Sequence, residues 1–386
     1  MAIPKADRSL KWYAAREPIV VGVLAILAFA GFAGVGALTA LFHRQQQARG
    51  IRWYNRGTAD LQAGSLGRAV ADFRTALRFS RDNKSYQLGL AEALAAQGRA
   101  GKQAAYVYLQ DLWEREPENG TVNLELARIL ADKGDKDGAL RYYHNAIYAL
   151  WDGNPDIQRR AARLELSEFL LGENASTQAQ AELIALSSDL PEDAAIHVRV
   201  GDLFMQAGDY QHALQEYRQA LRIDRQSPAA MAGIGKAAFE VGNYSLSQRY
   251  LQQAVAAGAD SGSAQLLDTV NQVQRLDPFR RKIPAAQRAR ITVEAFATAG
   301  QRLKECLARA SSPASASSPS AGQALQTQWS DMKPRITEAG LRRNPDEVEA
   351  AMDLVFDIER ETSSQCGTPT GANLALLLIS KLHEGN

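Results

Sequence analysis

Residues 208–224 read GDYQHALQEYRQALRID, and residues 242–255 repeat the arrangement as GNYSLSQRYLQQAV. The first stretch places Gly208, Ala213, Tyr217 and Ala220 at intervals that return 34 residues later as Gly242, Ser247, Leu251 and Ala254. A small residue precedes each stretch, at Gly201 and Gly235. A fixed period of this length indicates an array of repeated structural units rather than one globular core.

The period extends towards the N-terminus with the same small and large positions. It is found around Gly57, Ala91, Ala127 and, in weaker form, Ser167, which with the two stretches above makes six units between 51 and 258. Two antiparallel helices approach closely only where one side chain is a hydrogen or a methyl group, and large neighbours fill the remaining gaps. Each unit is therefore predicted to be a helical hairpin that shares its core with the next one.

Glycine recurs where the first helix of a hairpin must end, at Gly64, Gly98, Gly134, Gly208 and Gly242. Glycine adopts the left-handed conformation of a helix C-terminal cap without steric penalty. The weakest unit, 167–191, lacks this glycine and its aromatic residue, and WDGNPD at 151–156 looks inserted between units.

This pattern resembles the tetratricopeptide repeat family, with the strongest match between Ala195 and Val255. The resemblance covers about half of the chain and implies a right-handed superhelix whose concave face holds other proteins or peptide segments. In this family the first helix of each pair lines the groove, and the position after the small residue here is occupied by Thr58, Glu92, Arg128, Glu168, Asp202 and Lys236. The resemblance therefore predicts partner contacts at Arg128, Asp202 and Lys236, with Met205 and Phe239 as nearby apolar anchors. An ordinary solvated helix face is the alternative interpretation.

An apolar segment precedes the repeats. Residues 18–42 contain no charged side chain, and at about 1.5 Å per residue they are long enough to cross a hydrocarbon core of about 30 Å. We expect one transmembrane helix after a short tail at 1–17. A cleaved secretory signal is the alternative, although its apolar region is usually shorter, about 7–15 residues. Basic residues flank both ends, so charge does not decide the orientation, and the length of the C-terminal body favours a single-pass inner membrane protein with an extracytoplasmic body.

The remainder of the chain is also predicted to be helical. Capping helices are expected at 259–310, a flexible Ser/Pro/Ala loop at 311–322 and a C-terminal helical segment at 323–386. Within that segment we expect one helix from about Ala324 to Leu341 and another whose start is capped by Asn344, with Glu347 completing a capping box. Sparse β-branched and aromatic residues make the whole chain an all-α candidate.

The two cysteines lie on either side of the predicted loop. A disulfide between Cys306 and Cys366 would close a loop of about sixty residues and stabilise the fold by about 4 kcal/mol. Such a bond favours an oxidising, extracytoplasmic compartment, whereas two buried thiols would fit the cytoplasm. The alternatives are thus an envelope scaffold, possible membership of a larger membrane complex as a structural subunit, and a cytoplasm-facing adaptor that regulates a membrane enzyme.

The composition gives no indication of catalysis. Lysine and arginine number 44 against 43 acidic residues, which argues against a nucleic-acid partner. GIGKA at 233–237 lacks the remaining residues of a phosphate-binding loop, and neither the five histidines nor the two cysteines have the spacing of a metal site. We therefore expect no enzyme, catalytic residue, cofactor or metal.

Overall fold

The computed structural model describes residues 8–310 and 321–383, with side chains from Val20 onwards, and these residues are almost entirely helical. Between those limits the prediction of an all-α chain is confirmed. The helices are α1 (Arg8–Gln62), α2 (Leu66–Phe79), α3 (Lys84–Ala95), α4 (Arg99–Arg115), α5 (Gly120–Lys133), α6 (Lys136–Tyr148), α7 (Pro155–Gly172), α8 (Ser176–Ser187), α9 (Ala194–Gln206), α10 (Tyr210–Ile223), α11 (Pro228–Glu240), α12 (Tyr244–Ala256), α13 (Ser261–Leu276), α14 (Ala285–Ala310), α15 (Ala321–Met332), α16 (Glu338–Arg343), α17 (Asp346–Cys366) and α18 (Gly371–His383).

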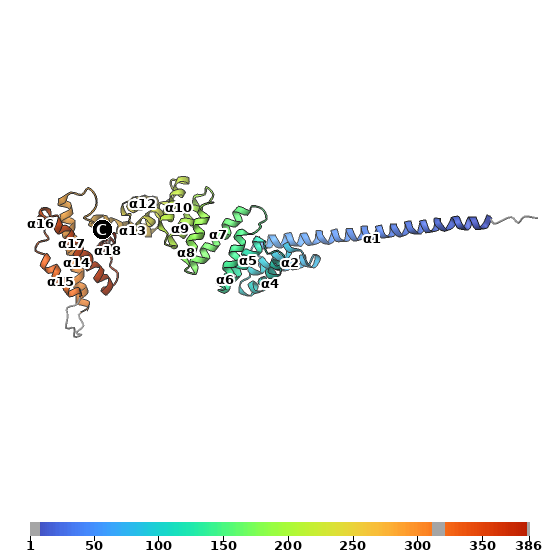
Figure 1. Ribbon diagram of the computed structural model, residues 1–386, viewed down its shortest axis with the longest axis horizontal. Helices are drawn as coiled ribbons and strands as arrows, with labels where there is room; N and C mark the ends of the chain where they lie inside the picture. Colours follow the sequence, from blue (N-terminus) through green and yellow to red (C-terminus); the bar gives the residue numbers. More distant parts are fainter. Residues whose placement is uncertain (1–7, 311–320, 384–386) are drawn as a thin grey trace, which may run out of the picture. The chain divides into compact units, whose positions relative to one another are not determined.

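The chain divides into two compact units, residues 1–163 and 164–386, with the boundary inside α7. In the first unit, each helix from α1 to α6 packs against the next one in the sequence (Figure 1). In the second unit, the helices from α8 to α13 do the same. This sequential stacking is the arrangement that the 34-residue period predicts.

Large side chains sit between glycines of successive hairpins. In the first unit Phe73 on α2 is buried between Gly57 on α1 and Gly89 on α3, where an added Cβ would lie 2.9 Å and 2.7 Å from its ring. In the second unit Tyr217 on α10 lies in the same way between Gly201 on α9 and Gly233 on α11. The absent side chains let one aromatic ring fill the space between three helices.

All five predicted turn glycines have a positive φ, between 70° and 90°. The weak fourth hairpin, α7 and α8, lacks a glycine there, and Asn174 takes its place with φ 58°. Asparagine is among the few other residues that visit this region routinely. The loss of the glycine therefore leaves the turn geometry intact.

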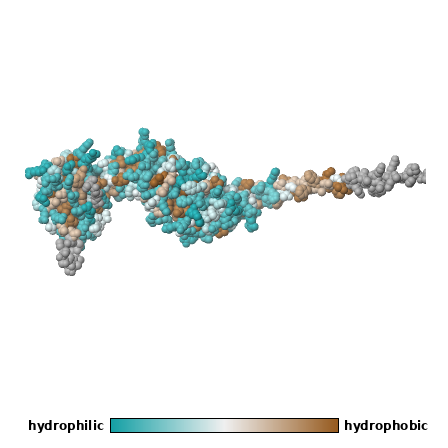
Figure 2. Space-filling model, in the orientation of Figure 1, coloured by the Kyte–Doolittle hydropathy of each residue, from teal (hydrophilic) through white to brown (hydrophobic). Residues whose placement is uncertain are grey.

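α1 joins the apolar segment to the first repeat without a break. It is one helix of 55 residues, so part of the predicted N-terminal tail, from Arg8 to Glu17, is helical, while residues 1–7 lie outside the described part. Its most apolar window has a mean hydropathy of 2.3 and is not buried. By length and composition α1 is able to cross a membrane, as a signal sequence also would be. Figure 2 shows the apolar surface giving way to polar surface where α1 enters the repeats.

The WDGNPD segment packs along the preceding loop of the first unit. The amide of Gly120 donates to the carbonyl of Leu150 at 2.9 Å, and the amide of Leu150 donates to the carbonyl of Glu118 at 2.8 Å. The indole of Trp151 covers Gly120 and donates to the carbonyl of Ala146 at 2.9 Å. The insertion is therefore anchored to the repeats and not a free linker.

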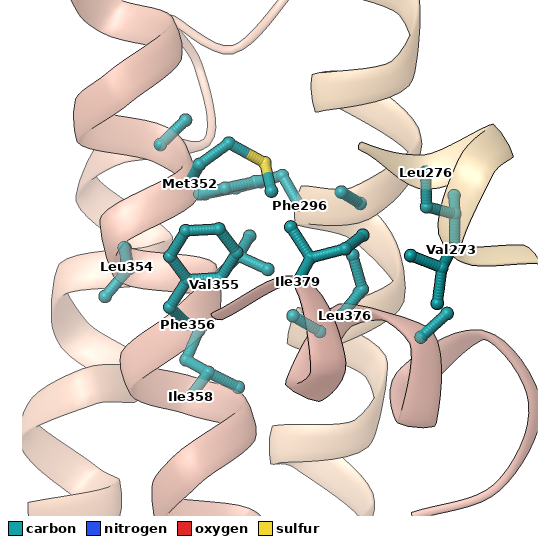
Figure 3. Packing of buried hydrophobic residues seen from close by; sticks show 14 of the residues in the cluster. Val273, Leu276, Phe296, Met352, Leu354, Val355, Phe356, Ile358, Leu376 and Ile379 are labelled. Atoms are coloured by element: carbon teal, nitrogen blue, oxygen red, sulfur yellow. The ribbon is translucent and has the colours of Figure 1, made fainter. Parts of the chain in front are cut away.

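The C-terminal helices continue the core of the last hairpin. α18 packs against α13 and α17, and α14 packs against α17, so the helices before and after residues 311–320 share one core. Figure 3 shows Val273 and Leu276 of α13 beside Leu376 and Ile379 of α18. Leu251 of α12 belongs to the same buried cluster. α18 thus covers the open end of the array.

Two local predictions in this region are wrong. The helix expected from Ala324 to Leu341 is interrupted between α15 and α16, at 333–337, because Pro334 cannot continue the hydrogen-bond ladder. The capping box also does not form: the cap position of α17 is Pro345, without a side-chain hydrogen bond, and Glu347 pairs with Arg335 instead. The expected loop at 311–322 ends earlier, since Ala321 and Gly322 begin α15, and residues 311–320 lie outside the described part.

A disulfide joins Cys306 on α14 to Cys366 at the end of α17, with their Cα atoms 5.8 Å apart. A buried charged pair lies beside it. The Nε atom of Arg302 is 3.4 Å from Oε2 of Glu359, which is fully buried, and Arg302 also donates to Thr362 Oγ1 and to the carbonyl of Gly367, both at 2.8 Å. Burial raises the pKa of Glu359 to about 8, and Arg302 opposes this rise only in part.

Glu359 is expected to make the second unit less stable as the pH rises. Its folded-state pKa of about 8 lies above the unfolded value, so the unfolded chain loses this proton first and stability falls from about pH 4.5 to pH 8. Glu359→Gln removes that penalty, while Arg302 keeps its contacts with Thr362 and Gly367. We expect the variant to be more stable than the parent by about 2 kcal/mol at pH 8.5 and equal to it near pH 5.

Urea unfolding of both proteins at the two pH values, without reductant, checks this expectation. Asp353→Asn, which also removes one carboxylate but at an exposed position of the same helix, is the control. A parent protein whose stability does not change between pH 5 and pH 8.5 would contradict the prediction.

Candidate partner-binding surface

Four of the five predicted contact residues lie on two neighbouring helices of the second unit. Asp202 and Met205 are on α9, and Lys236 and Phe239 are on α11, which packs against α9. Each pair is separated by the 34-residue period, so equivalent positions of successive hairpins stand next to each other. Arg128 is on α5 of the first unit and is described separately.

Asp202 is exposed but held in place by the core aromatic residue behind it. The hydroxyl of Tyr217 donates to Oδ1 of Asp202 at 2.6 Å. Burial, together with this hydrogen bond, raises the pKa of the Tyr217 phenol well above its usual value. The second carboxylate oxygen accepts no hydrogen bond from the described residues, and Asp202 therefore presents a fixed acceptor to solvent.

Lys236 is half-buried and paired with the next hairpin. Its Nζ lies 3.2 Å from Oδ2 of Asp260, which also accepts from the amide of Ser263 at 2.7 Å and so caps α13. The Ser263 amide and then Lys236 lower the pKa of Asp260. A ligand that contacts Lys236 must therefore share its ammonium group with Asp260, the residue that caps α13.

Met205 and Phe239 are less available than the sequence suggested. Met205 packs against the buried cluster that contains Phe204 and Tyr217. Phe239 packs edge-on against Tyr244, with ring centroids 5.5 Å apart, and contacts the C-terminal core. Both side chains are half-buried, so each offers an edge to a ligand rather than its full apolar surface.

Arg128 belongs to a small cluster of acidic and basic side chains in the first unit. It is ion-paired with Glu125 on the same helix, and Glu92 on α3 interacts with both. Burial and then the Glu125 charge raise the pKa of Glu92 to about 7, while Arg128 lowers it. With a pKa of about 7, the Glu92 carboxyl exchanges its proton near neutral pH, and a nearby cation favours the loss of that proton.

The sequence did not reveal which charged residues on these helix surfaces pair with each other. Arg199 on α9 pairs with Glu168 on α7, where Nη2 of Arg199 lies 2.5 Å from Oε1 of Glu168. Arg199 was not among the predicted contact residues. Gly89 and Gly233 were also missed as contacts of the aromatic rings. A signal existed for these glycines, because each lies two residues before a small packing position, Ala91 or Gly235.

The polar side chains on these helix surfaces contact other residues of the same unit. Among the described residues no group of three or more His, Cys, Asp or Glu side chains could hold a metal ion. The charged residues described above are engaged in ion pairs, hydrogen bonds and caps on helix surfaces. Such an arrangement can exchange its ion pairs for those of another polypeptide.

Two segments match known repeat families. A model described as tetratricopeptide repeat matches residues 54–110, and another described as TPR repeat matches residues 201–242. The chain contains tetratricopeptide repeats. The first match covers the end of α1 through most of α4, and the second covers the C-terminal part of α9 through the end of α11. The tetratricopeptide repeats thus include Asp202, Met205, Lys236 and Phe239, whereas Arg128 lies outside both matches.

Solved structures of other repeat proteins are similar to about half of the chain. YrrB, described as a TPR protein with an unusual peptide-binding site, is 18% identical over 50% of this chain and 95% of its own, with a TM-score of 0.36. PilF of Pseudomonas aeruginosa is 18% identical over 50% of this chain and 84% of its own, with a TM-score of 0.35. PilW, a type IV pilus biogenesis factor, is 16% identical over 57% and 98%, with a TM-score of 0.42. No curated protein matches the sequence.

Proposed function

We propose that this protein is a membrane-anchored scaffold that binds or assembles partner proteins at the cell envelope through its tetratricopeptide repeats. It acts by binding and not by catalysis. Residues 18–42 hold it in the inner membrane as a single span, and the repeats face the periplasm or another extracytoplasmic space. The partners are proteins or peptide segments, including subunits of a larger membrane complex.

The observation that carries this proposal is the continuity of α1. The helix that is apolar enough to cross a bilayer is also the first helix of the first repeat, since Gly57 and Tyr54 of α1 contact Phe73 of α2. Removal of the apolar part as a signal would cut directly into the helix that packs the first hairpin. A permanent anchor keeps that helix whole.

The Cys306–Cys366 disulfide supports the extracytoplasmic orientation. Cytosolic thiols are kept reduced, whereas disulfides persist in the periplasm and outside the cell. We therefore expect a membrane-impermeant thiol reagent, added to cells after reduction of the disulfide, to label these two cysteines from the extracytoplasmic side.

The proposed partner-contact surface is formed by Asp202 and Met205 on α9 and by Lys236 and Phe239 on α11, and it is called the strip. Asp202 and Lys236 supply one fixed acceptor and one cation at equivalent positions of neighbouring hairpins, flanked by the edges of Met205 and Phe239. Arg128 supplies a further contact in the first unit. A segment of mixed charge suits this surface better than a uniformly acidic tail, because Asp202 and Lys236 present opposite charges side by side.

Photoreactive residues placed at positions 202, 236 and 128 test the assignment in living cells. We expect crosslinks to the same partner at 202 and 236, at least fivefold stronger than at positions 218 and 252, as expected when a few central residues dominate binding. Arg218 and Gln252 are exposed residues on the second helices of the same two hairpins and are also 34 residues apart. Crosslinks confined to 218 and 252 would rule out the strip as the contact surface.

A further inference from the structure

The first hairpin carries a group of exposed arginines at the end that adjoins the apolar part of α1. Arg44, Arg49 and Arg52 lie on α1, Arg78 lies in the last turn of α2, and Arg81 follows α2. All five side chains are exposed, and none forms an ion pair with another described residue. These residues are called the arginine rim below.

Contacts within the first unit place the α2–α3 turn on the membrane side of the repeat. Gly57 of α1 faces Phe73, and Gly50, seven residues closer to the apolar segment, faces Phe79 and Tyr86. α2 therefore runs antiparallel to α1, towards the apolar segment, and α3 runs back from it. The turn that connects Phe79 to Tyr86 must lie at the level of Gly50 or nearer to the apolar segment.

The distance along α1 brings this turn within reach of lipid headgroups. The uncharged segment ends at Phe42, and Gly50 lies eight positions further along the continuous helix, a rise of about 12 Å. The headgroup layer occupies the first part of that distance, since a bilayer of about 40–45 Å has a hydrocarbon core of about 30 Å. The remaining gap is shorter than the Debye length of about 8–10 Å at physiological salt.

The local charge is strongly one-sided. Asp82 is the one acidic residue within the turn 80–83, and it stands against the five arginines of the rim. Lys84, the next basic residue, is already paired with Glu116 of the second hairpin. Unpaired, exposed guanidinium groups at one end of a helical hairpin are suited to the phosphates of anionic lipids, which arginine binds in a bidentate manner.

We infer that the α2–α3 turn and the arginine rim are a second membrane contact, which docks the first repeat onto anionic lipid headgroups. The inference depends on the proposed membrane anchor. It goes beyond that anchor because α1 alone would allow the helix to tilt freely, whereas a docked turn restricts the tilt of the repeats. The partner is the lipid surface itself and not another protein.

Two serines at opposite ends of α2 provide a matched measurement. Ser65 precedes α2 and Ser80 follows it, separated by a helix of 14 residues or about 21 Å. Ser65→Cys or Ser80→Cys is labelled with a fluorophore in the full chain without reductant, so that Cys306 and Cys366 stay bonded. The labelled chain is then reconstituted in nanodiscs that contain a quencher attached to the lipid headgroups.

We expect quenching at position 80 to be at least about threefold stronger than at position 65, and stronger again when about 30% phosphatidylglycerol replaces phosphatidylcholine. Arg78→Glu with Arg81→Glu should abolish the effect of the anionic lipid. Arg222→Glu with Arg225→Glu is the matched control, because these exposed residues occupy the same positions at the end of α10. It should leave the quenching unchanged.

Equal quenching at positions 65 and 80 in a chain that stays with the disc would overturn the inference and leave the anchor standing. Quenching that ignores the anionic lipid, or that responds equally to both charge reversals, would overturn the role of the arginine rim. Loss of the chain from the disc would overturn the anchor itself. Crosslinking to partners at positions 202 and 236 reports on the scaffold separately.

Discussion

Gly233→Val is expected to destabilise the second unit by about 3 kcal/mol, because an added side chain would overlap the buried ring of Tyr217. The opposite face of that ring is closed by Gly201, where a Cβ would be 2.7 Å away, so the ring has no space to move into. Hydrogen exchange of the α9–α12 amides under native conditions measures the loss. The amides should open at least a hundredfold more often than in the parent.

Two further variants distinguish overlap from a general effect of valine. Gly172→Val, at the exposed end of α7 with no atom near its Cβ position, should change stability by less than about 0.5 kcal/mol. Gly233→Val combined with Tyr217→Leu should lose at least about 1 kcal/mol less than the sum of the two single changes. Additive losses would mean that the glycine and the ring are not coupled.

Loss of the disulfide is expected to have a comparable or larger effect on the C-terminal helices. Cys306→Ala with Cys366→Ala releases a 60-residue separation, which the chain-entropy model values at about 4 kcal/mol. The effect should be concentrated in α14 and α17, the two helices that the bond joins. Urea unfolding with hydrogen exchange of these helices measures it.

Reduction of the parent protein provides the control for this pair of substitutions. The reduced parent should unfold at nearly the same urea concentration as the double variant, since both lack the cross-link while only the variant lacks the sulfur atoms. If the oxidised parent and the double variant have the same midpoint, the core around Met352 and Phe356 holds these helices without help from the bond.

The sequence predicts the hairpins well because their determinants are local and periodic. Gly208 has its counterpart 34 residues later at Gly242, and Tyr217 has its counterpart at Leu251. The structure places each of them where that spacing requires. The break at Pro334 could also have been predicted from the residue itself. It was missed because the apolar pattern on both sides fits one helix.

The contacts that shape the strip could not be predicted from the period. Arg199 reaches Glu168 across 31 residues, and Lys236 reaches Asp260 across 24 residues, so neither pair follows the repeat. Long charged side chains choose among several partners according to the local surface, and the repeat pattern is silent about that choice. The residues proposed for partner contact therefore remain predictions, although their positions on α9 and α11 are known.

The position of α18 has a consequence for biosynthesis. The apolar face of α13 is covered by Leu376 and Ile379 of α18, which is synthesised well after α13. Repeats nearer the N-terminus are able to close one after another during translation, but the last hairpin of the array has to wait until α18 is made. A chain that lacks α18 is consequently expected to expose the apolar face of α13, the kind of surface that makes folding intermediates prone to aggregation.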